Sequence, residues 1–368
     1  SLAMGGLGAS MAGGAWFGHK MMSRRLDRLD EKSREGFVLP SDPVFPPGAP
    51  DHGWRAGYTK DQYLPVDITD DNDVAHNLIV GQSGVGKTTL ILWRVYQSLL
   101  RGSGAIIINA KIDADFRSDL HHMCRIMGRE DDFLAFNPDD PDNTNTWNPL
   151  LVGDGMEIAA RLLSLIPTTE SSPGADHYKQ QSNTALMALV DAIRACNRTV
   201  HWGDMVLLAQ NSSAIMALEA MVARSGNVHA HRLLSIILNQ FKYPTKKGVR
   251  FDNQKFKQEL GGIVGRIAAF ANFGDVMNTY APEINLVDVI LNKKILYVEV
   301  PTMHKDITAI NLAKLFVSDI RSAAARIQKL PVSERPKHPY PVIIDEFGAL
   351  ATALSLIHIS EPTRPLYI

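Results

Sequence analysis

The residues whose types and spacing most directly suggest chemistry lie in a glycine-rich stretch, Gly81–Thr88. The stretch reads GQSGVGKT and fits GxxxxGK[ST], in which glycines let the loop curl so that backbone N–H groups point at phosphate oxygens. Lys87 is expected to reach the β- and γ-phosphates, and the Thr88 hydroxyl to bind Mg²⁺. A glycine turn followed by a surface lysine is the structural alternative. The pattern predicts a nucleotide site made of Gly81, Gln82, Ser83, Gly84, Val85, Gly86, Lys87, Thr88 and Thr89.

A second candidate lies near the other end of the chain, where the apolar run 342–344 ends in Asp345 and Glu346. Beside a phosphate loop, Asp345 would hold Mg²⁺ through water. Glu346 would polarise the attacking water as the general base. A charged cap on a buried strand is the alternative interpretation, because many strands end this way. Together the two motifs predict a P-loop ATPase that uses ATP and Mg²⁺.

Alternating apolar strands and helical patterns surround both motifs and must position them. Short buried runs predict strands over 77–81, 105–110, 132–138, 294–300 and 340–346. Helical patterns cover 88–100, 116–128 and 307–328, whereas residues 153–283 show helical patterns alone. This order predicts an α/β fold with a parallel sheet. The nucleotide-binding domain is expected in two halves, 76–152 and 284–350, separated by an inserted all-α domain, 153–283.

The N-terminal region differs in character from the rest of the chain. Residues 1–18 carry no charge, end in Trp16 and Phe17, and precede the basic residues of 20–28. This pattern predicts the end of a transmembrane helix with the following chain in the cytoplasm. A flexible glycine-rich start is the alternative. Residues 19–75 are expected to form a basic juxtamembrane segment and a proline-rich linker.

Composition limits how the chain could bind nucleic acid. Lys and Arg total 38 against 39 Asp and Glu, so any nucleic-acid contact must come from a local patch. The segment 241–257 combines basic residues with phenylalanines and a tyrosine, a pattern that suits single-stranded nucleic acid. A solvated loop between helices explains the same charges. The candidate cations are Lys242, Lys246, Lys247, Arg250, Lys255 and Lys257.

Two weaker features carry alternatives of their own. Asn109–Asp113 follows the second expected strand at the edge where open α/β sheets bind ligands, and a solvated loop explains it equally well. His121 and His122 are adjacent on a helix and face different ways, so they are expected to be surface or half-buried residues. The only cysteines are Cys124 and Cys196, which excludes a disulfide scaffold.

Over roughly residues 1–350 the chain resembles the type IV coupling proteins, the TraD/TraG kind of conjugative transfer ATPase. The resemblance rests on HNLIVGQSGVGKT (76–88), INAKID (108–113), the NPL stretch within 136–150, ILYVEVP (295–301) and VIIDEFGAL (342–350). Asn109 stands where that family has the aspartate of a D-x-K-G-like motif. The resemblance implies a RecA-like P-loop NTPase domain and a membrane-anchored homo-hexamer at the bacterial inner membrane.

The family also implies cargo and partners. The cargo would be DNA, a relaxase–DNA complex or sometimes protein, and the receiving partner a type IV secretion channel. A DNA translocase of the FtsK/HerA kind or a channel-assembly ATPase is an alternative motor, and a non-hydrolysing nucleotide-binding adaptor is an alternative outside the motors. Residues 351–368 do not match the family, so Arg364 is not expected to be its arginine finger. The sequence is therefore expected to be a fragment cut at both ends.

Overall fold

The computed structural model describes residues 50–59, 64–82, 84–165, 173–245, 248–300 and 306–347. These residues fall into two compact units. The first comprises the chain up to Gly102 together with Asp113–Phe133, and the second comprises Ser103–Ile112 and the chain from Leu134 onward. Each unit is described by itself.

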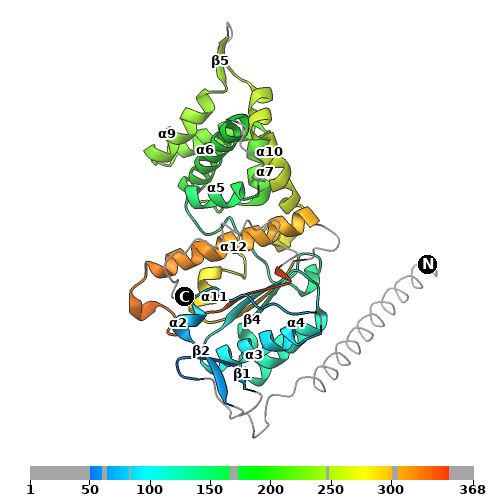
Figure 1. Cartoon of the computed structure of the whole chain (residues 1–368). Coiled ribbons are helices and arrows are strands. Elements are labelled where there is room, and N and C mark those ends of the chain that lie inside the picture. The colour runs from blue at the N-terminus through cyan, green and yellow to red at the C-terminus, as the bar shows by residue number, and fades with distance from the viewer. Residues whose placement is uncertain are drawn as a thin grey trace, which may run out of the picture. The chain divides into compact units, whose positions relative to one another are not determined.

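The first unit contains an antiparallel ribbon and the helix that follows the glycine-rich loop (Figure 1). Strand β1 (Gly53–Tyr58) pairs with β2 (Pro65–Thr69), and the short helix α2 (Asp70–Asp73) follows directly. Helix α3 (Lys87–Leu100) and helix α4 (Ala114–Ile126) complete the unit with a 3-10 turn at Glu130–Asp132. The ribbon corrects the expectation that residues 19–75 form only a linker. Alternating apolar residues in VDIT and GWRAGY allow the pairing, because a strand needs only a short extended run with a partner.

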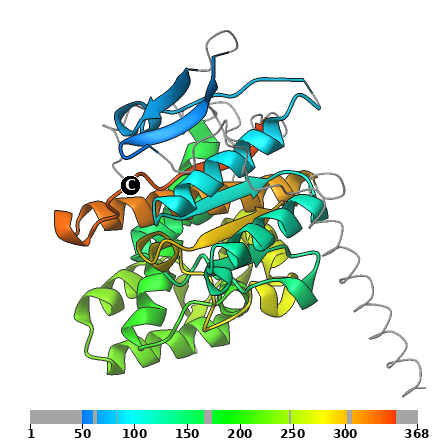
Figure 2. The same ribbon diagram turned by 90° about the horizontal axis from the view of Figure 1, so that it is seen from below.

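The second unit is built on a four-stranded sheet with the order β4-β7-β3-β8. Strand β3 (Ala105–Asn109) pairs in parallel with both β7 (Ile295–Glu299) and β8 (Val342–Asp345), and β4 (Phe133–Phe136) lies beyond β7. All residues of β3 and β7 are buried, as expected for central parallel strands. Figure 2 shows β3 and β7 side by side in the sheet, although paired residues such as Asn109 and Glu299 are 190 positions apart in the chain. The predicted α/β fold with a parallel sheet is confirmed.

Helices of the second unit form the inserted domain and its support. Helix α12 (Asp306–Gln328) lies between the sheet and the inserted helices in Figure 1, and α11 (Leu286–Leu291) packs beside it. Trp147 stacks on Phe316 of α12, and Phe136 packs edge-on against both rings. The inserted helices are α5 (Gly155–Leu163), α6 (Pro173–Ala195), α7 (Trp202–Gln210), α8 (Ser212–Arg224), α9 (Val228–Asn239) and α10 (Asn253–Ala271). Single 3-10 turns occur at Pro141–Asn143, Gly274–Val276 and Val332–Glu334.

Two features of the strands differ from expectation. The inserted domain is helical as predicted, but β5 (Lys242–Thr245) and β6 (Gly248–Phe251) also form an antiparallel hairpin within it. Tyr243, Thr245, Val249 and Phe251 supply the β-favouring side chains that the basic composition of this segment obscures. The expected strand over 77–81 is absent from all three described sheets, and Leu78, Ile79 and Val80 are 78%, 51% and 85% exposed. An extended run becomes a strand only when it pairs with a neighbouring strand, and the composition of the run does not determine whether such a neighbour exists.

Candidate functional site

The glycine-rich loop has the backbone geometry that its sequence predicts. Gly84 and Gly86 adopt left-handed conformations, with φ of 79° and 94°, that residues with side chains rarely adopt. A Cβ at Gly81 would approach Val85 Cγ2 to 2.8 Å, so the loop curls back closely on itself. The Lys87 ammonium donates to the carbonyl oxygens of Gly81 and Gln82, each at 2.9 Å. The loop is therefore folded around a cation, and Lys87 must exchange these carbonyls for any phosphate it binds.

The start of α3 differs from the other helix starts that the structure describes. Its N-cap is Gly86, which has no side chain to accept from the first backbone N–H groups, and its first turn holds no acidic residue. Every other helix of six or more residues with a described N-cap is capped by a side chain. The N–H groups at the start of α3 are thus not satisfied by a cap and carry the positive end of the helix dipole. Such a terminus is suited to bind phosphate.

Thr88 and Thr89 follow Lys87 in this first turn, and both are exposed. Ser83, the remaining predicted loop residue, lies outside the described residues. Thr88 and Asp345 offer a hydroxyl and a carboxylate, which are the oxygen ligands that Mg²⁺ prefers, so the chemistry of the donor set fits this ion. Among the described residues there is no cluster of three or more His, Cys, Asp or Glu side chains that could hold a metal by itself. Mg²⁺ is usually bound through one or two protein oxygens together with the phosphate oxygens of a substrate.

The acidic pair stands at the end of β8, as predicted. Asp345 is half-buried, and its Oδ1 accepts from the Glu346 backbone N–H at 2.9 Å. Glu346 is exposed and has a φ of 51°, in the left-handed region that residues other than glycine, asparagine and aspartate seldom occupy. This conformation costs on the order of 1 kcal/mol and recurs at active sites. The turn leaves the Glu346 side chain exposed beyond the strand end.

A buried polar row that the sequence reasoning missed continues from Asp345 along the same sheet edge. Asn109 is in register with Asp345 on one side and with Glu299 on the other. Glu299 is 2% exposed and accepts from Asn137 Nδ2 at 2.9 Å. The Asn109 amide donates to Tyr297 Oη and its oxygen accepts from the Lys111 backbone N–H. The sequence did contain a signal for Glu299. This carboxylate ends the apolar run ILYVE in the same way as Asp345 ends the run VIID.

The weaker candidates have structural explanations. Asp113 is the N-cap of α4, and its Oδ1 accepts from the Phe116 backbone N–H at 3.0 Å. His121 lies 3.3 Å from Glu130, and the His122 ring lies 2.9 Å from Arg125. Both histidines are half-buried, as expected. Cys124 is buried, which raises its pKa to about 12 and makes it unreactive.

The basic segment forms the β5–β6 hairpin and the start of α10. Lys242 binds both carboxylate oxygens of Glu219, and Lys255 lies 3.9 Å from Glu259. Arg250 and Lys257 are exposed, whereas Lys246 and Lys247 lie outside the described residues. The aromatic rings pack together instead of forming a stacking surface, because Phe241 and Phe256 are 4% and 1% exposed. The prediction that these two phenylalanines stack on bases is thus wrong. Tyr243, in contrast, is exposed.

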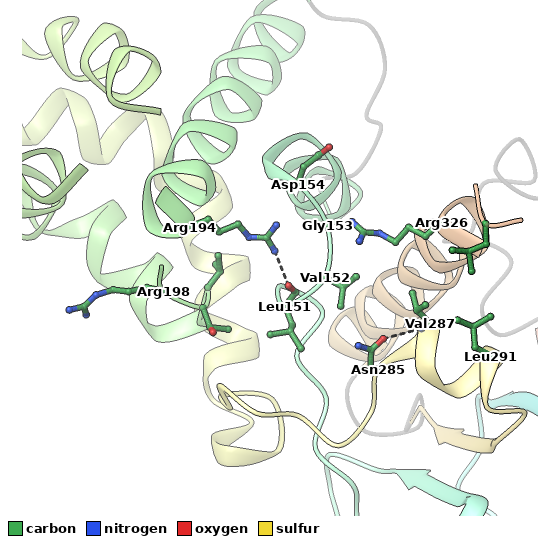
Figure 3. A pocket seen from close by; sticks show the side chains of 13 residues that line it. Leu151, Val152, Gly153, Asp154, Arg194, Arg198, Asn285, Val287, Leu291 and Arg326 are labelled. Carbon is green, nitrogen blue, oxygen red and sulfur yellow. Dashed lines mark hydrogen bonds between the residues drawn. The ribbon is translucent and has the colours of Figure 1, made fainter. Parts of the chain in front are cut away.

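A cavity of about 780 Å³ lies in the second unit where the inserted domain joins α11 and α12 (Figure 3). Arg194 and Arg326 point toward one another across the connecting segment that contains Gly153, while Arg198 extends away from them. Arg194 donates to the Leu151 carbonyl at 2.8 Å, and Arg326 pairs with Glu157 at 2.6 Å. These arginines already serve the junction, so their charge does not define a ligand site.

A buried ion pair beside this cavity joins the inserted domain to α12. Arg161 of α5 is fully buried and lies 2.8 Å from Asp319 of α12, which also accepts from Trp147 Nε1. Arg161 donates further to the carbonyls of Pro149 and Val152. Burial raises the pKa of Asp319 to about 6, against the opposing effect of Arg161. The pair is embedded in protein and serves the architecture, because it leaves no room for a substrate.

The membrane segment predicted over 1–18 lies outside the described residues. Within the described part, no single helix is both long and apolar enough to cross a membrane. Helices α7 and α8 reach that length and composition only as a pair, bent by 108°.

Comparison with known proteins agrees with the resemblance seen in the motifs. No family model matches the chain. The chain is 24% identical to the type 4 coupling protein DotL of Legionella pneumophila subsp. pneumophila, over an alignment that covers 77% of this chain and 42% of DotL. The predicted resemblance to type IV coupling proteins is thereby confirmed. The chain spans less than half of that relative.

Solved structures of another coupling protein are also similar to this chain. Unbound TrwBΔN70 matches at a TM-score of 0.49 with 16% identity, covering 82% of this chain and 62% of that protein. TrwB in complex with the ATP analogue ADPNP matches at 0.49 with 17% identity, covering 82% of this chain and 64% of that protein.

Proposed function

We propose that this chain is the nucleotide-binding part of a type IV coupling protein, an ATPase that drives transfer of DNA or a nucleoprotein into a secretion channel. The observation that carries the proposal is the start of α3, where a curled glycine loop, an uncapped helix end and Lys87 converge. The likeness to DotL supports the same class of protein.

Each site residue has a proposed role in hydrolysis. Bound Mg²⁺ would neutralise charge on the phosphates and help to orient them. Lys87 leaves the carbonyls of Gly81 and Gln82 and binds the β- and γ-phosphates. Thr88 would bind Mg²⁺ through its hydroxyl, and Asp345 would hold the ion through water. Glu346 accepts a proton from the attacking water, for which its exposed position beyond β8 is suited.

The remaining parts of the proposal concern assembly and location. TrwB has been solved with ADPNP and with ADP and Mg²⁺, and we propose ATP and Mg²⁺ as the ligands of this chain. We further propose attachment to the inner membrane through residues 1–18, a cytoplasmic nucleotide site and a homo-hexamer. A DNA-stimulated ATPase assay on the longer parent protein tests the activity. Stimulation by DNA supports the proposal, and hydrolysis that no DNA substrate alters argues against a transfer motor.

We also propose that the β5–β6 hairpin segment contacts DNA through its cations. Replacing Lys246, Lys247 and Arg250 with Ala should weaken DNA binding more at low salt than at high salt. For each phosphate that the variant no longer neutralises, the slope of log K against log salt flattens by roughly 0.7 for single strands or 0.9 for duplex. The matched control is Lys242→Ala, because Glu219 already neutralises Lys242. An unchanged slope in the triple variant would leave the segment as a solvated hairpin.

A further inference from the structure

One face of α3 is bound to the β1–β2 ribbon by side chains that hold the backbone of a single residue, Arg55. Gln97 Oε1 accepts from the Arg55 N–H at 2.7 Å, and Gln97 Nε2 donates to the Arg55 carbonyl at 2.9 Å. Trp93 Nε1 donates to the same carbonyl at 2.6 Å. Gln97 is fully buried, so these hydrogen bonds are shielded from water. The helix and the strand are thus joined at three points around one residue.

Two ion pairs extend the same attachment to α2. Arg94 of α3 pairs with Asp73 at 2.5 Å, and Arg101 pairs with Asp70 at 2.5 Å. Asp73 also accepts from Trp54 Nε1 at 2.8 Å, and the Arg94 guanidinium lies over the Trp54 ring. Arg94 is 6% exposed, and burial lowers its pKa against the opposing effect of Asp73. These ion pairs are therefore shielded from solvent to a degree that surface pairs are not.

Three side chains of α3 and that of its C-cap residue, Arg101, share one side of the helix. Positions 93, 97 and 101 are spaced by four residues, and 94 lies three before 97, so together they form one stripe. The same helix begins at Lys87 of the glycine-rich loop. A helix of 14 residues is about 20 Å long and transmits a rotation from one end to the other, because its backbone hydrogen bonds make it stiff.

The ribbon is itself fixed at the point where α3 is attached. Arg55 lies where the β1–β2 register shifts, and such bulges re-aim the strand. Its guanidinium binds both carboxylate oxygens of Asp67 on β2, at 2.8 and 3.2 Å, and donates to Tyr58 Oη at 3.1 Å. The backbone groups that Gln97 holds therefore belong to a braced residue.

We propose that Gln97, Trp93 and Arg94 are positioning residues for the nucleotide site, and that the β1–β2 ribbon sets the orientation of the α3 N-terminus. Through these contacts the ribbon holds the direction of α3, and with it the position of Lys87, Thr88 and the phosphate-binding N–H groups. This inference rests on the proposed function, because it assigns positioning residues to the same site. A ribbon that only stabilises the fold would change the melting temperature and leave nucleotide affinity alone.

The test is Gln97→Met, which keeps the volume and removes both hydrogen bonds to Arg55. Binding of fluorescent mant-ADP is measured at a temperature where the chain is fully folded, with hydrogen exchange of the amides of 90–93, which are bonded within the helix, as the second readout. We expect affinity to fall about tenfold and exchange of these amides to rise. Asp73→Asn is the milder variant and should give a smaller effect in the same direction, should Gln97→Met not fold.

The matched control is Leu234→Ala in α9, where a side chain that is 1% exposed is truncated far along the chain from the ribbon contacts. It should lower the melting temperature and leave mant-ADP affinity unchanged. Unchanged affinity and exchange in folded Gln97→Met and Asp73→Asn would overturn the inference. Lys87→Ala separates the two proposals: if it abolishes mant-ADP binding while the ribbon variants do not alter it, the nucleotide site stands and only its positioning by the ribbon fails.

Discussion

Helices α3 and α5 begin in opposite ways, although their first turns present the same backbone groups. At α5, Asp154 accepts from the Glu157 N–H at 2.8 Å and Glu157 accepts from the Asp154 N–H at 3.1 Å, a complete capping box. At α3, Gly86 stands at the N-cap in a left-handed conformation and provides no side chain. One helix start is satisfied within the chain and contributes stability. The other leaves its donors without a side-chain cap, an arrangement that suits an anion.

The difference shows how to separate residues that maintain the fold from residues that bind a ligand. Helix starts in the inserted domain are capped by Asp, Asn or His wherever the cap is described. Substitutions there should change stability without changing nucleotide affinity. Substitutions at the start of α3 should do the reverse, since the one internal interaction that they remove is that of Lys87 with its own loop.

The largest expected effect is that of Lys87→Ala. The variant loses the cation on the β- and γ-phosphates, and removing one such stabilising group typically costs about 10²- to 10³-fold in turnover. We expect nucleotide binding and hydrolysis to be lost with little change in melting temperature. Steady-state ATPase rates and mant-ADP titration measure this, with Lys329→Ala at the exposed end of α12 as the control. Turnover near that of the unmodified protein would show that the site is elsewhere.

Glu346→Gln should separate binding from chemistry. Glutamine is nearly isosteric and preserves the turn after β8, but it cannot accept a proton from water. We expect ATP to bind with unchanged affinity while turnover falls about 10²- to 10⁴-fold. Single-turnover hydrolysis together with mant-ATP binding distinguishes these quantities. Parallel losses of affinity and turnover would instead assign Glu346 a structural role, consistent with its left-handed backbone.

Arg161→Met tests the buried junction between the inserted domain and α12. The variant leaves Asp319 without its 2.8 Å partner, and breaking a buried pair in this way costs about 3–5 kcal/mol. The pKa of Asp319 is already raised to about 6 by burial, so the folded state holds its proton more tightly than the unfolded state. This group therefore contributes stability at low pH that is lost as pH rises through about 6.

Without Arg161 the pKa of Asp319 should rise further, because the charge that lowers it is gone. The destabilisation should then be smaller at pH 5 than at pH 8. Urea unfolding at both pH values measures this, and the double variant with Asp319→Asn removes the titrating group as a control. An equal loss of stability at both pH values, or a dependence that persists in the double variant, would show that another group is responsible.

The smallest expected effect is that of Asp154→Ala at the start of α5. Loss of the cap should cost about 1 kcal/mol, or roughly 2–4 °C in melting temperature for a domain of this size. Nucleotide affinity should not change. Calorimetry and mant-ADP titration, run on the same samples, measure the two quantities. A loss of nucleotide affinity in Asp154→Ala would contradict the distinction between a stabilising start of α5 and a ligand-binding start of α3.

Local patterns were sufficient to predict most elements of the fold. The buried runs AIIIN and ILYVE form the central strands β3 and β7. Gly128 follows the end of α4, as expected of a glycine that stops a helix. The candidate nucleotide-binding residues could also be predicted from the sequence. Gly84, Gly86 and Lys87 must occur at fixed spacing to curl a loop around phosphate.

The parts that could not be predicted depend on pairing between distant segments. The 77–81 run has the composition of a strand but no neighbour in the described sheets, and the β1–β2 ribbon forms because Arg55 and Asp67 meet across two strands. Glu299 and Asn137 became a polar pair only when β7 and β4 ended at the same sheet edge. The hydrogen bonds of Gln97 to Arg55 likewise join positions 42 residues apart.

The most direct test of the central claim is a calorimetric titration of the unmodified chain with Mg²⁺-ADP and, separately, with adenosine. If the uncapped start of α3 and Lys87 provide the binding energy, ADP should bind one-to-one and adenosine at least about 100-fold more weakly, since it lacks the phosphates that these groups contact. Adenosine binding as tightly as ADP, or no ADP binding at millimolar concentration, would contradict the assignment of the Gly81–Thr88 loop as a phosphate site.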